Sequence, residues 1–184
     1  MQSDRENIRS EVRAAIARGA LFGEALEAVG RYSVICRGPD GEIKWEENFP
    51  NLVTTTGKNY ILDNALSGST FTAAYYLGLV DGGTTPTYNE ADTSASHAGW
   101  TENQSYSAGT RPSIGFNAAS AGSKSSSAVV FAISASATIS GCFLTTSNAK
   151  GGTAGTLVSA GNFSAGSRAL LNGDQLSVTY SLSI

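Results

Sequence analysis

The chain has 184 residues, a length that predicts one main domain with a sizeable core. Only 15% of the residues are charged, against about 25% in an average soluble domain, so hydroxyl and amide groups must wet much of the surface. The formal net charge of -3 provides no basic field for a run of phosphates, which argues against nucleic acid as a partner.

The sequence contains no apolar run of the roughly 18 residues that a membrane-spanning helix needs. Its first residues, MQSDRENIRSEVR, carry charges where a secretory signal peptide would carry an apolar segment. We therefore expect a protein that is made and kept in a cytoplasm and that does not bind a membrane.

The first 30 residues are expected to form a helical arm. Ser3 and Glu6 have the S-x-x-E spacing of a capping box, which predicts a helix over about residues 4–17. The apolar positions of this helix recur every four residues and form a narrow stripe that needs a partner surface: Ile8, Val12 and Ile16. A second apolar set, Leu21, Phe22, Leu26 and Val29, follows among glycines and is expected to form a short helix or an extended arm. Of this set, Leu21, Phe22 and Leu26 are expected to contact a partner.

Residues 31–184 are expected to form a mainly β body, with a β-sandwich or jelly-roll-like architecture and one short internal helix. A hairpin is predicted around the turn at 38–41, and a helix over 51–66, which Thr55 or Thr56 can cap. Further strands are predicted over 73–80, 128–135, 137–145, 156–163 and 175–184. Residues 81–117 are rich in Gly, Thr, Ser and Asn and are interpreted as long loops with room for one strand.

The two cysteines and the histidine of the chain have no pattern of a reactive site. Cys36 and Cys142 each lie inside an apolar, strand-like run, which favours buried free thiols over a disulfide. His97 has Asp92, Ser94 and Ser96 nearby, but neighbours in sequence rarely reach the geometry of a catalytic triad. We expect a loop imidazole that hydrogen-bonds locally or packs beside the next aromatic residue, Trp100.

Motifs for metals, phosphates and glycosidic bonds are incomplete. Zinc would need more Cys and His ligands, and calcium would have only Asp81 and Asp92 with backbone carbonyls. Residues 150–156 lack the closing Gly-Lys-Ser/Thr of a phosphate-binding loop and are interpreted as a turn between strands. Glu46 and Glu47 are adjacent on a predicted strand and should point to opposite faces. We therefore expect no enzymatic activity, no cofactor and no metal.

Three aromatic residues in the long loop region are the remaining candidates for binding: Tyr88, Trp100 and Tyr106. Such rings stack on sugars or anchor a protein interface. The alternative is that they pack in the core, and the sequence leaves both interpretations open.

Several stretches beyond residue 30 resemble a family of tailed-bacteriophage virion structural proteins. They are DGEIKWEENFPNLVTTTGKNYILDNAL (40–66), YYLGLVD (75–81), ADTSASHAGWTE (91–102), TRPS (110–113) and SGCFLTTSNAKGGTAGTLVSAGNF (140–163). The resemblance implies a structural protein of the virion, and the family carries no catalytic signature that could be transferred to this chain.

The leading hypothesis is a capsid cement or decoration protein that binds the major capsid protein and stabilises the shell. In it, the β body lies over junctions of the shell and the arm extends along neighbouring subunits. By analogy, a homo-oligomer such as a trimer at local threefold positions is expected. Its location would be the virion, after assembly in the host cytoplasm. The alternatives are a tail, fibre or adaptor protein of the virion, and a glycan-binding module that uses Trp100 and Tyr106.

Overall fold

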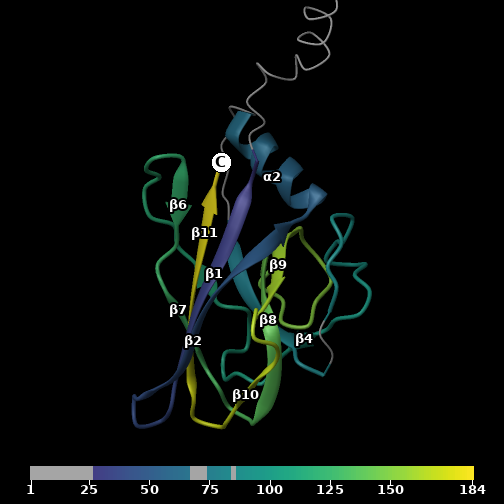
Figure 1. Cartoon of the computed structure of the whole chain (residues 1–184). Coiled ribbons are helices and arrows are strands. Elements are labelled where there is room, and N and C mark those ends of the chain that lie inside the picture. Colours follow the sequence, from purple (N-terminus) through teal and green to yellow (C-terminus); the bar gives the residue numbers. More distant parts are fainter. Residues whose placement is uncertain (1–26, 67–73, 84–85) are drawn as a thin grey trace, which may run out of the picture.

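The computed structural model describes residues 27–66, 74–83 and 86–184. Within them the chain forms eleven strands and one helix (Figure 1). The elements are β1 (Val29–Arg37), β2 (Ile43–Val53), α2 (Thr55–Leu66), β3 (Tyr75–Asp81), β4 (Glu102–Asn103), β5 (Ser113–Ile114), β6 (Ser123–Ser125), β7 (Val129–Ala132), β8 (Ala137–Thr145), β9 (Leu157–Asn162), β10 (Arg168–Leu170) and β11 (Gln175–Ser183). The prediction of a mainly β body with one internal helix is confirmed. The predicted helix of the arm lies outside the described residues.

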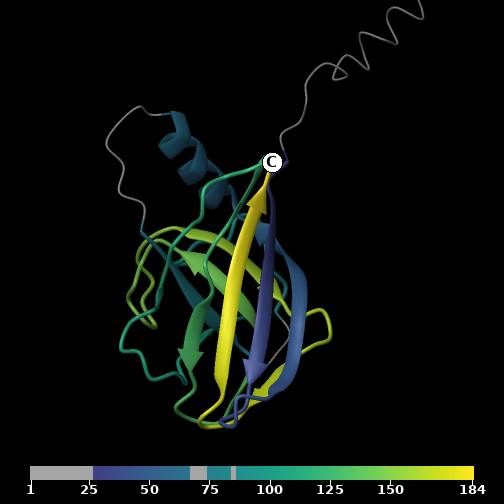
Figure 2. The same ribbon diagram turned by 90° about the vertical axis from the view of Figure 1, so that its left-hand side faces the viewer.

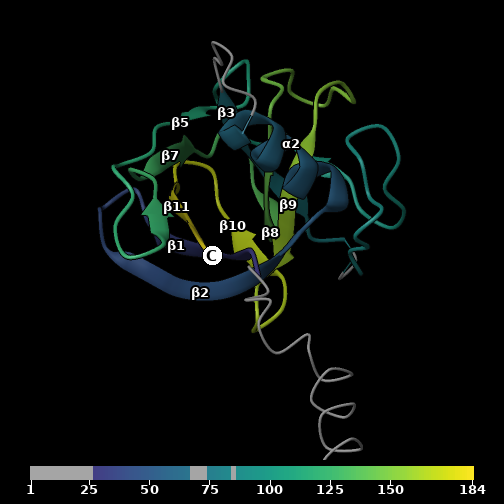
Figure 3. The same ribbon diagram turned by 90° about the horizontal axis from the view of Figure 1, so that it is seen from above.

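The strands form an antiparallel sheet with the order β4-β3-β8-β9-β2-β1-β11-β6, to which β5, β7 and β10 add at β3, β11 and β8. Strand β2 joins the two halves of this sheet. Its residues 43–51 pair with β1, whereas Leu52 and Val53 pair with Ala160 and Ser159 of β9. Seen from above, β1, β2 and β11 lie on one side of the body, β3, β8 and β9 lie on the other, and α2 lies across one end (Figure 3).

The main core lies between the two halves of the sheet. Strands β1 and β11 alternate buried and more exposed residues, and their buried residues include Tyr32, Val34, Leu176 and Val178. This period of two is the one that the sequence shows, because successive side chains of a strand point to opposite faces. The facing residues come from β3 and β8 and belong to the same apolar cluster: Leu77, Leu79, Cys142 and Leu144.

Both cysteines are buried free thiols in this core, as predicted. Burial raises the pKa of the Cys142 thiol well above its usual range. It also raises the pKa of Cys36 to about 11, with the neighbouring Asp174 carboxylate adding to the effect. Both groups therefore stay protonated at neutral pH and pack as small apolar side chains.

The half of the sheet that contains β8 and β9 is buried on both faces. Phe143, Leu157 and Ala160 point away from the main core and form a second apolar cluster with Trp100, against which Tyr88 packs. The long segment between β3 and β4 therefore covers the outer face of this half. Burial on both faces explains why β8 and β9 have continuous buried runs instead of an alternating pattern.

The helix begins later than the sequence predicts, because tertiary pairing determines its first residues. Asn51 pairs with Gly30 of β1, and the next two residues pair with β9, so residues 51–53 belong to β2. The backbone N–H of Gly57 donates to Thr54 Oγ1 at 3.0 Å. Thr54 is therefore the N-cap residue, and the prediction of Thr55 or Thr56 is wrong.

Thr54→Ala is expected to lower the free energy of unfolding by about 1–2 kcal/mol, since it removes a helix cap. The same hydroxyl also donates to the carbonyl oxygen of Leu157, so its loss weakens the attachment of α2 to β9. Urea unfolding followed by circular dichroism measures the change. Thr55→Ala is the matched control, because Thr55 is exposed. Equal effects of the two substitutions would contradict the assignment of the cap.

The remaining predicted strands are confirmed, and the structure has four further short strands, whereas the sequence predicts at most one, in the loop region 81–117. Residues 81–117 contain the two-residue strands β4 and β5, and β6 and β10 have three residues each. Elements of this length show no period in the sequence, so their pairing depends on the longer strands beside them. The turn at 38–41 lies where the sequence predicts it.

Candidate functional site

The three aromatic residues that were candidates for binding all lie against buried clusters. Trp100 is 7% exposed and Tyr106 is 2% exposed. The Trp100 ring lies 5.3 Å from that of Phe143, and the Tyr106 ring lies 5.0 Å from that of Phe131, measured between centroids. For these two residues the burial supports core packing over an exposed binding surface.

Tyr88 is partly buried and holds its loop against β9. Its hydroxyl donates to Asn162 Oδ1 at 2.7 Å, and Asn162 Nδ2 donates to the carbonyl oxygen of Pro86 at 2.6 Å. Burial raises the pKa of Tyr88 above its usual range, and the nearby Cys142 and Asp92 add to the increase. Tyr88 thus fixes the covering segment in place.

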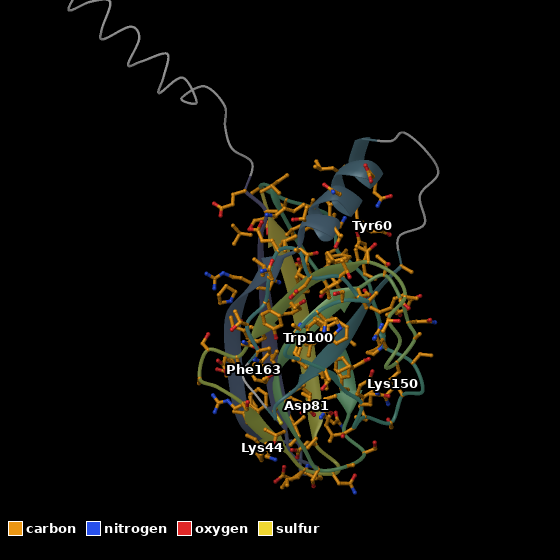
Figure 4. All side chains as sticks on the ribbon, turned by 90° about the vertical axis from the view of Figure 1, so that its right-hand side faces the viewer. Lys44, Tyr60, Asp81, Trp100, Lys150 and Phe163 are labelled. Carbon is orange, nitrogen blue, oxygen red and sulfur yellow. The ribbon has the colours of Figure 1, made fainter. Side chains whose placement is uncertain are left out.

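His97 packs beside Trp100, as the sequence predicts. The two rings are stacked, with centroids 3.9 Å apart and an interplanar angle of 24°. Within the described part of the chain, His97 Nδ1 has no hydrogen-bond partner. The hydrogen bond to a carboxylate that orients the histidine of a catalytic triad is therefore not formed at this atom. Figure 4 shows Trp100 at mid-height in the body.

Glu102 and Arg111 form a buried ion pair beside His97. Their side chains are 7% and 4% exposed. Arg111 Nε donates to Glu102 Oε1 at 3.0 Å, and an Arg111 terminal nitrogen donates to Glu102 Oε2 at 2.8 Å. Arg111 also donates to the carbonyl oxygens of Ser147 and Gly152. The pair therefore clamps the loop after β4 to the loop between β8 and β9.

The same carboxylate determines what the glycine-rich segment 150–156 can bind. The backbone N–H of Gly151 donates to Glu102 Oε2 at 2.6 Å, which places a negative charge where a phosphate would need donors. Lys150 Nζ donates to the carbonyl oxygens of Tyr106 and Ala108 and lies 3.8 Å from the centre of the Tyr106 ring. Both groups that could contact a phosphate thus have partners within the protein.

A pocket of about 280 Å³ lies beside this ion pair. Its lining includes Ser94, His97, Glu102, Arg111 and Gly152. The two charged groups of the lining are already paired with each other and with backbone groups, so they act as structural contacts.

Asp81 and Asp92, the candidate calcium ligands of the sequence, accept hydrogen bonds from neighbouring residues of the protein. Asp81 accepts hydrogen bonds from the N–H of Gly83 at 3.0 Å and from Asn103 Nδ2 at 2.8 Å. Asp92 accepts one from the N–H of Asn89 at 3.0 Å. In residues 27–66, 74–83 and 86–184, no group of three or more His, Cys, Asp and Glu side chains is placed to hold a metal ion.

Glu46 and Glu47 differ in their surroundings, as alternation along β2 requires. Glu46 is exposed, whereas the side chain of Glu47 is largely buried. Glu47 accepts hydrogen bonds from the N–H of Ala165 at 2.9 Å and from Arg168 at 3.3 Å. Glu47 therefore fastens the segment after β9 to the middle of β2.

A surface groove of about 480 Å³ with a mainly apolar lining lies beneath α2. We call it the apolar groove. Its lining comes from α2, from six strands and from the segment after β5: Ile61, Tyr75, Ile114, Gly115, Phe116, Lys124, Leu144, Val158, Tyr180 and Leu182. Lys124 is the one charged residue in this lining, so the groove suits an apolar occupant.

Three of the six exposed large apolar side chains in the described residues lie at the same end of the body, and the other three, Ile43, Val130 and Leu171, lie elsewhere. Leu62 is 54% exposed, Ile184 is 66% exposed and Val29 is 43% exposed. Leu62 follows Ile61 on α2, and Val29 pairs with Ser183 beside the C-terminal residue. Figures 1 and 2 show α2, the C-terminus and the start of β1 together at this end. Figure 4 shows Tyr60 of α2 at this end of the body and Lys44 at the opposite end.

The structure therefore shows an apolar surface at this end of the body, in addition to the candidate binding residues that the sequence predicts. The predicted partner-binding residues of the arm lie outside the described residues, so their role stays a prediction: Ile8, Val12, Ile16, Leu21, Phe22 and Leu26. One feature of the sequence relates to the groove: the apolar alternation of β11 includes Tyr180 and Leu182, which both line it.

Comparisons with known proteins add no family to these observations. No protein-family model and no curated protein matches the chain. In the part of the chain that the structure describes, no helix is long and apolar enough to cross a membrane. The function must therefore be argued from the residues themselves.

Proposed function

We propose that the protein is a non-enzymatic structural component of a bacteriophage particle, and specifically a capsid cement or decoration protein. It would be located in the virion after assembly in the host cytoplasm. We also propose that its two facing half-sheets form a β-sandwich. One observation carries the functional proposal: three exposed apolar side chains, Val29, Leu62 and Ile184, lie at the end of the body where the N-terminal arm joins it.

The position of this surface supports a docking role. Val29, Leu62 and Ile184 are exposed near the start of β1. The arm carries an apolar stripe of its own in the predicted helix, at Ile8, Val12 and Ile16. Exposed apolar patches on a protein surface mark sites of interaction with other proteins. The arm and this end of the body together form one candidate contact region.

The polar groups support a structural role for the body. The buried pair Glu102 and Arg111 fastens two loops, and Lys44 with Asp174 fastens a hairpin to a turn. The resemblance to virion structural proteins supports a location in a bacteriophage particle. A low content of charged residues, 15%, suits a body that packs closely among many copies.

In the proposed mechanism, many copies of the protein stabilise the shell together. Each copy would bury apolar side chains against the major capsid protein, and the arm would cross to a neighbouring subunit. Linked contacts raise the overall affinity, because the second contact forms at high effective concentration. A homo-oligomer, such as a trimer at local threefold positions, would multiply this effect.

Particles give a direct test of the role. Virions that lack the protein are expected to release DNA at lower temperature than complete virions, and the purified protein should restore their resistance. A cryo-EM map is expected to show copies spread over the shell. A few copies confined to the tail would favour a tail, fibre or adaptor protein instead. Glycan binding is less favoured, because the rings of Trp100 and Tyr106 are buried.

The stripe of the arm can be tested separately in the full chain. Changing Ile8, Val12 and Ile16 together to Ser is expected to weaken binding to the particle by about 100-fold or more, since each buried aliphatic side chain contributes about 1.5–3 kcal/mol. Cosedimentation of the purified protein with particles measures this change.

The matched control changes the opposite face of the predicted helix. Asn7→Gln, Ser10→Ala and Ala14→Ser together should leave the affinity for particles within about twofold, because these positions lie away from the stripe. If both triple variants bound as tightly as the unchanged protein, the arm would not be an anchor.

A further inference from the structure

The N-terminal arm enters the body beside the mouth of the apolar groove. Gly30 of β1 is the Cα partner of Leu182, and Leu182 is in turn the partner of Lys124 on β6. Leu182 and Lys124 both line the groove. The row of residues that lines one side of the groove thus continues directly into the first residues of β1.

An apolar set lies immediately before this point in the sequence. Leu26 directly precedes Glu27, the first described residue, and Phe22 precedes it by five positions. A fully extended chain spans at most about 3.6 Å per residue, so Phe22 lies within about 18 Å of Glu27. This short reach keeps Phe22 close to the groove of its own chain.

The groove has the chemistry that such side chains need. Its lining includes the aromatic rings of Tyr75, Phe116 and Tyr180 and the aliphatic side chains of Ile61 and Val158. A phenylalanine side chain buries about 150–250 Å² of surface, and aromatic pairs gain further from edge-to-face contact. Within the groove, Tyr75 and Phe116 already form such a pair, with ring centroids 5.5 Å apart.

We propose that Leu21, Phe22 and Leu26 dock into the apolar groove of their own chain and fix the start of the arm on the body. The stripe formed by Ile8, Val12 and Ile16 then projects from a defined position and is left for the partner. The assignment of the stripe to a partner rests on the proposed function, whereas the docking of Phe22 does not.

Docking within one chain is favoured over docking between copies by the short connection. A flexible connection of a few residues gives an effective concentration in the millimolar range or above. A second copy reaches such a concentration only in very concentrated solution. The groove of the free protein is therefore filled by its own arm.

Methyl NMR of the full-length protein tests the docking. The methyl signals of Ile61, Leu144 and Val158 report on the groove, and an aromatic ring beside them shifts these signals. Phe22→Leu keeps an apolar side chain but removes the ring, so these signals are expected to move. Val12→Leu is the matched control in the stripe and should leave them in place. Neither substitution alters a residue of the body.

Two results would overturn the proposal. If Phe22→Leu left all three methyl signals unchanged, the groove would not hold Phe22. If the signals moved but the effect disappeared on tenfold dilution, and the mass in solution were that of a dimer, the occupant would be the arm of a second copy. The experiment contains no particles, so docking can be confirmed even if the protein fails to bind a capsid, and the two proposals fail separately.

Discussion

Arg111→Met is expected to lower the free energy of unfolding by about 3–5 kcal/mol, because it leaves a buried carboxylate without its partner. Arg111 makes two hydrogen bonds to Glu102 and two to backbone carbonyls, and its guanidinium lies 5.1 Å from the centre of the Phe143 ring. Glu102 cannot move into solvent easily, since it is also held by the N–H of Gly151 and by the Tyr106 hydroxyl.

Arg111→Lys is expected to recover little of this loss. A lysine carries a single ammonium group and cannot reproduce the paired donors that contact both oxygens of Glu102. Arg31→Met is the control, because Arg31 is exposed on β1, and it should change the stability by less than about 0.5 kcal/mol. Guanidinium unfolding at neutral pH measures all three variants. A loss for Arg111→Met as small as that for Arg31→Met would show that the clamp is not needed for stability.

The parts of the fold that the sequence predicts are those with a local signal. The alternation of β11 is complete in the sequence, and the structure pairs this strand with β1 over nine residues. The burial of Cys36 and Cys142 and the packing of His97 beside Trp100 also follow from neighbouring residues. Each of these predictions needed only the residue types within a short stretch of chain.

The parts that were missed depend on residues far apart in the chain. Lys44 and Asp174 are separated by 130 positions, and the oxygen of Leu157 that accepts the Thr54 hydroxyl lies 103 positions away. No period or spacing in the sequence indicates such partners. The predicted start of the helix is wrong for the same reason, because residues 52 and 53 pair with β9 and belong to the sheet.

The loop aromatics show why exposure is hard to predict from one sequence. Tyr88 and Trp100 lie in a segment rich in turn-forming residues, which is typical of exposed loops. In the structure this segment covers the outer face of β8 and β9, and Trp100 packs on Phe143. The continuous apolar run of β8 was the signal that a second face needed covering, but nothing in the run shows which segment covers it.

Asp174→Asn is expected to lower the free energy of unfolding at pH 7 by about 2–3 kcal/mol, because a buried hydrogen-bonded charge is lost. Asp174 Oδ2 accepts hydrogen bonds from Lys44 Nζ at 2.5 Å and from the N–H of Leu171 at 2.9 Å. These contacts connect the hairpin of β1 and β2 to the turn before β11. The substitution keeps the size of the side chain but removes the charge that attracts Lys44.

The pH dependence of the free energy of unfolding distinguishes the contribution of the Asp174 charge from that of its packing. Burial alone would raise the pKa of Asp174, but the hydrogen bonds from Leu171 and Lys44 outweigh it and hold the pKa below its usual value. The unfolded chain therefore binds the proton more readily than the folded one. The stabilisation by Asp174 is complete above its ordinary value of about 3.9 and is lost as the pH falls through the lower, folded value.

The difference between the unchanged protein and Asp174→Asn should therefore be constant from pH 7 to about pH 5 and shrink below about pH 4. Asp40→Asn is the matched control, because Asp40 is exposed on the turn between β1 and β2 and accepts one hydrogen bond, from the N–H of Glu42. Urea unfolding at pH 7, 5 and 3 gives the three differences. If the difference in the free energy of unfolding between the unchanged protein and Asp174→Asn were the same at pH 3 as at pH 7, the shape of the side chain, and not the charge paired with Lys44, would stabilise this turn.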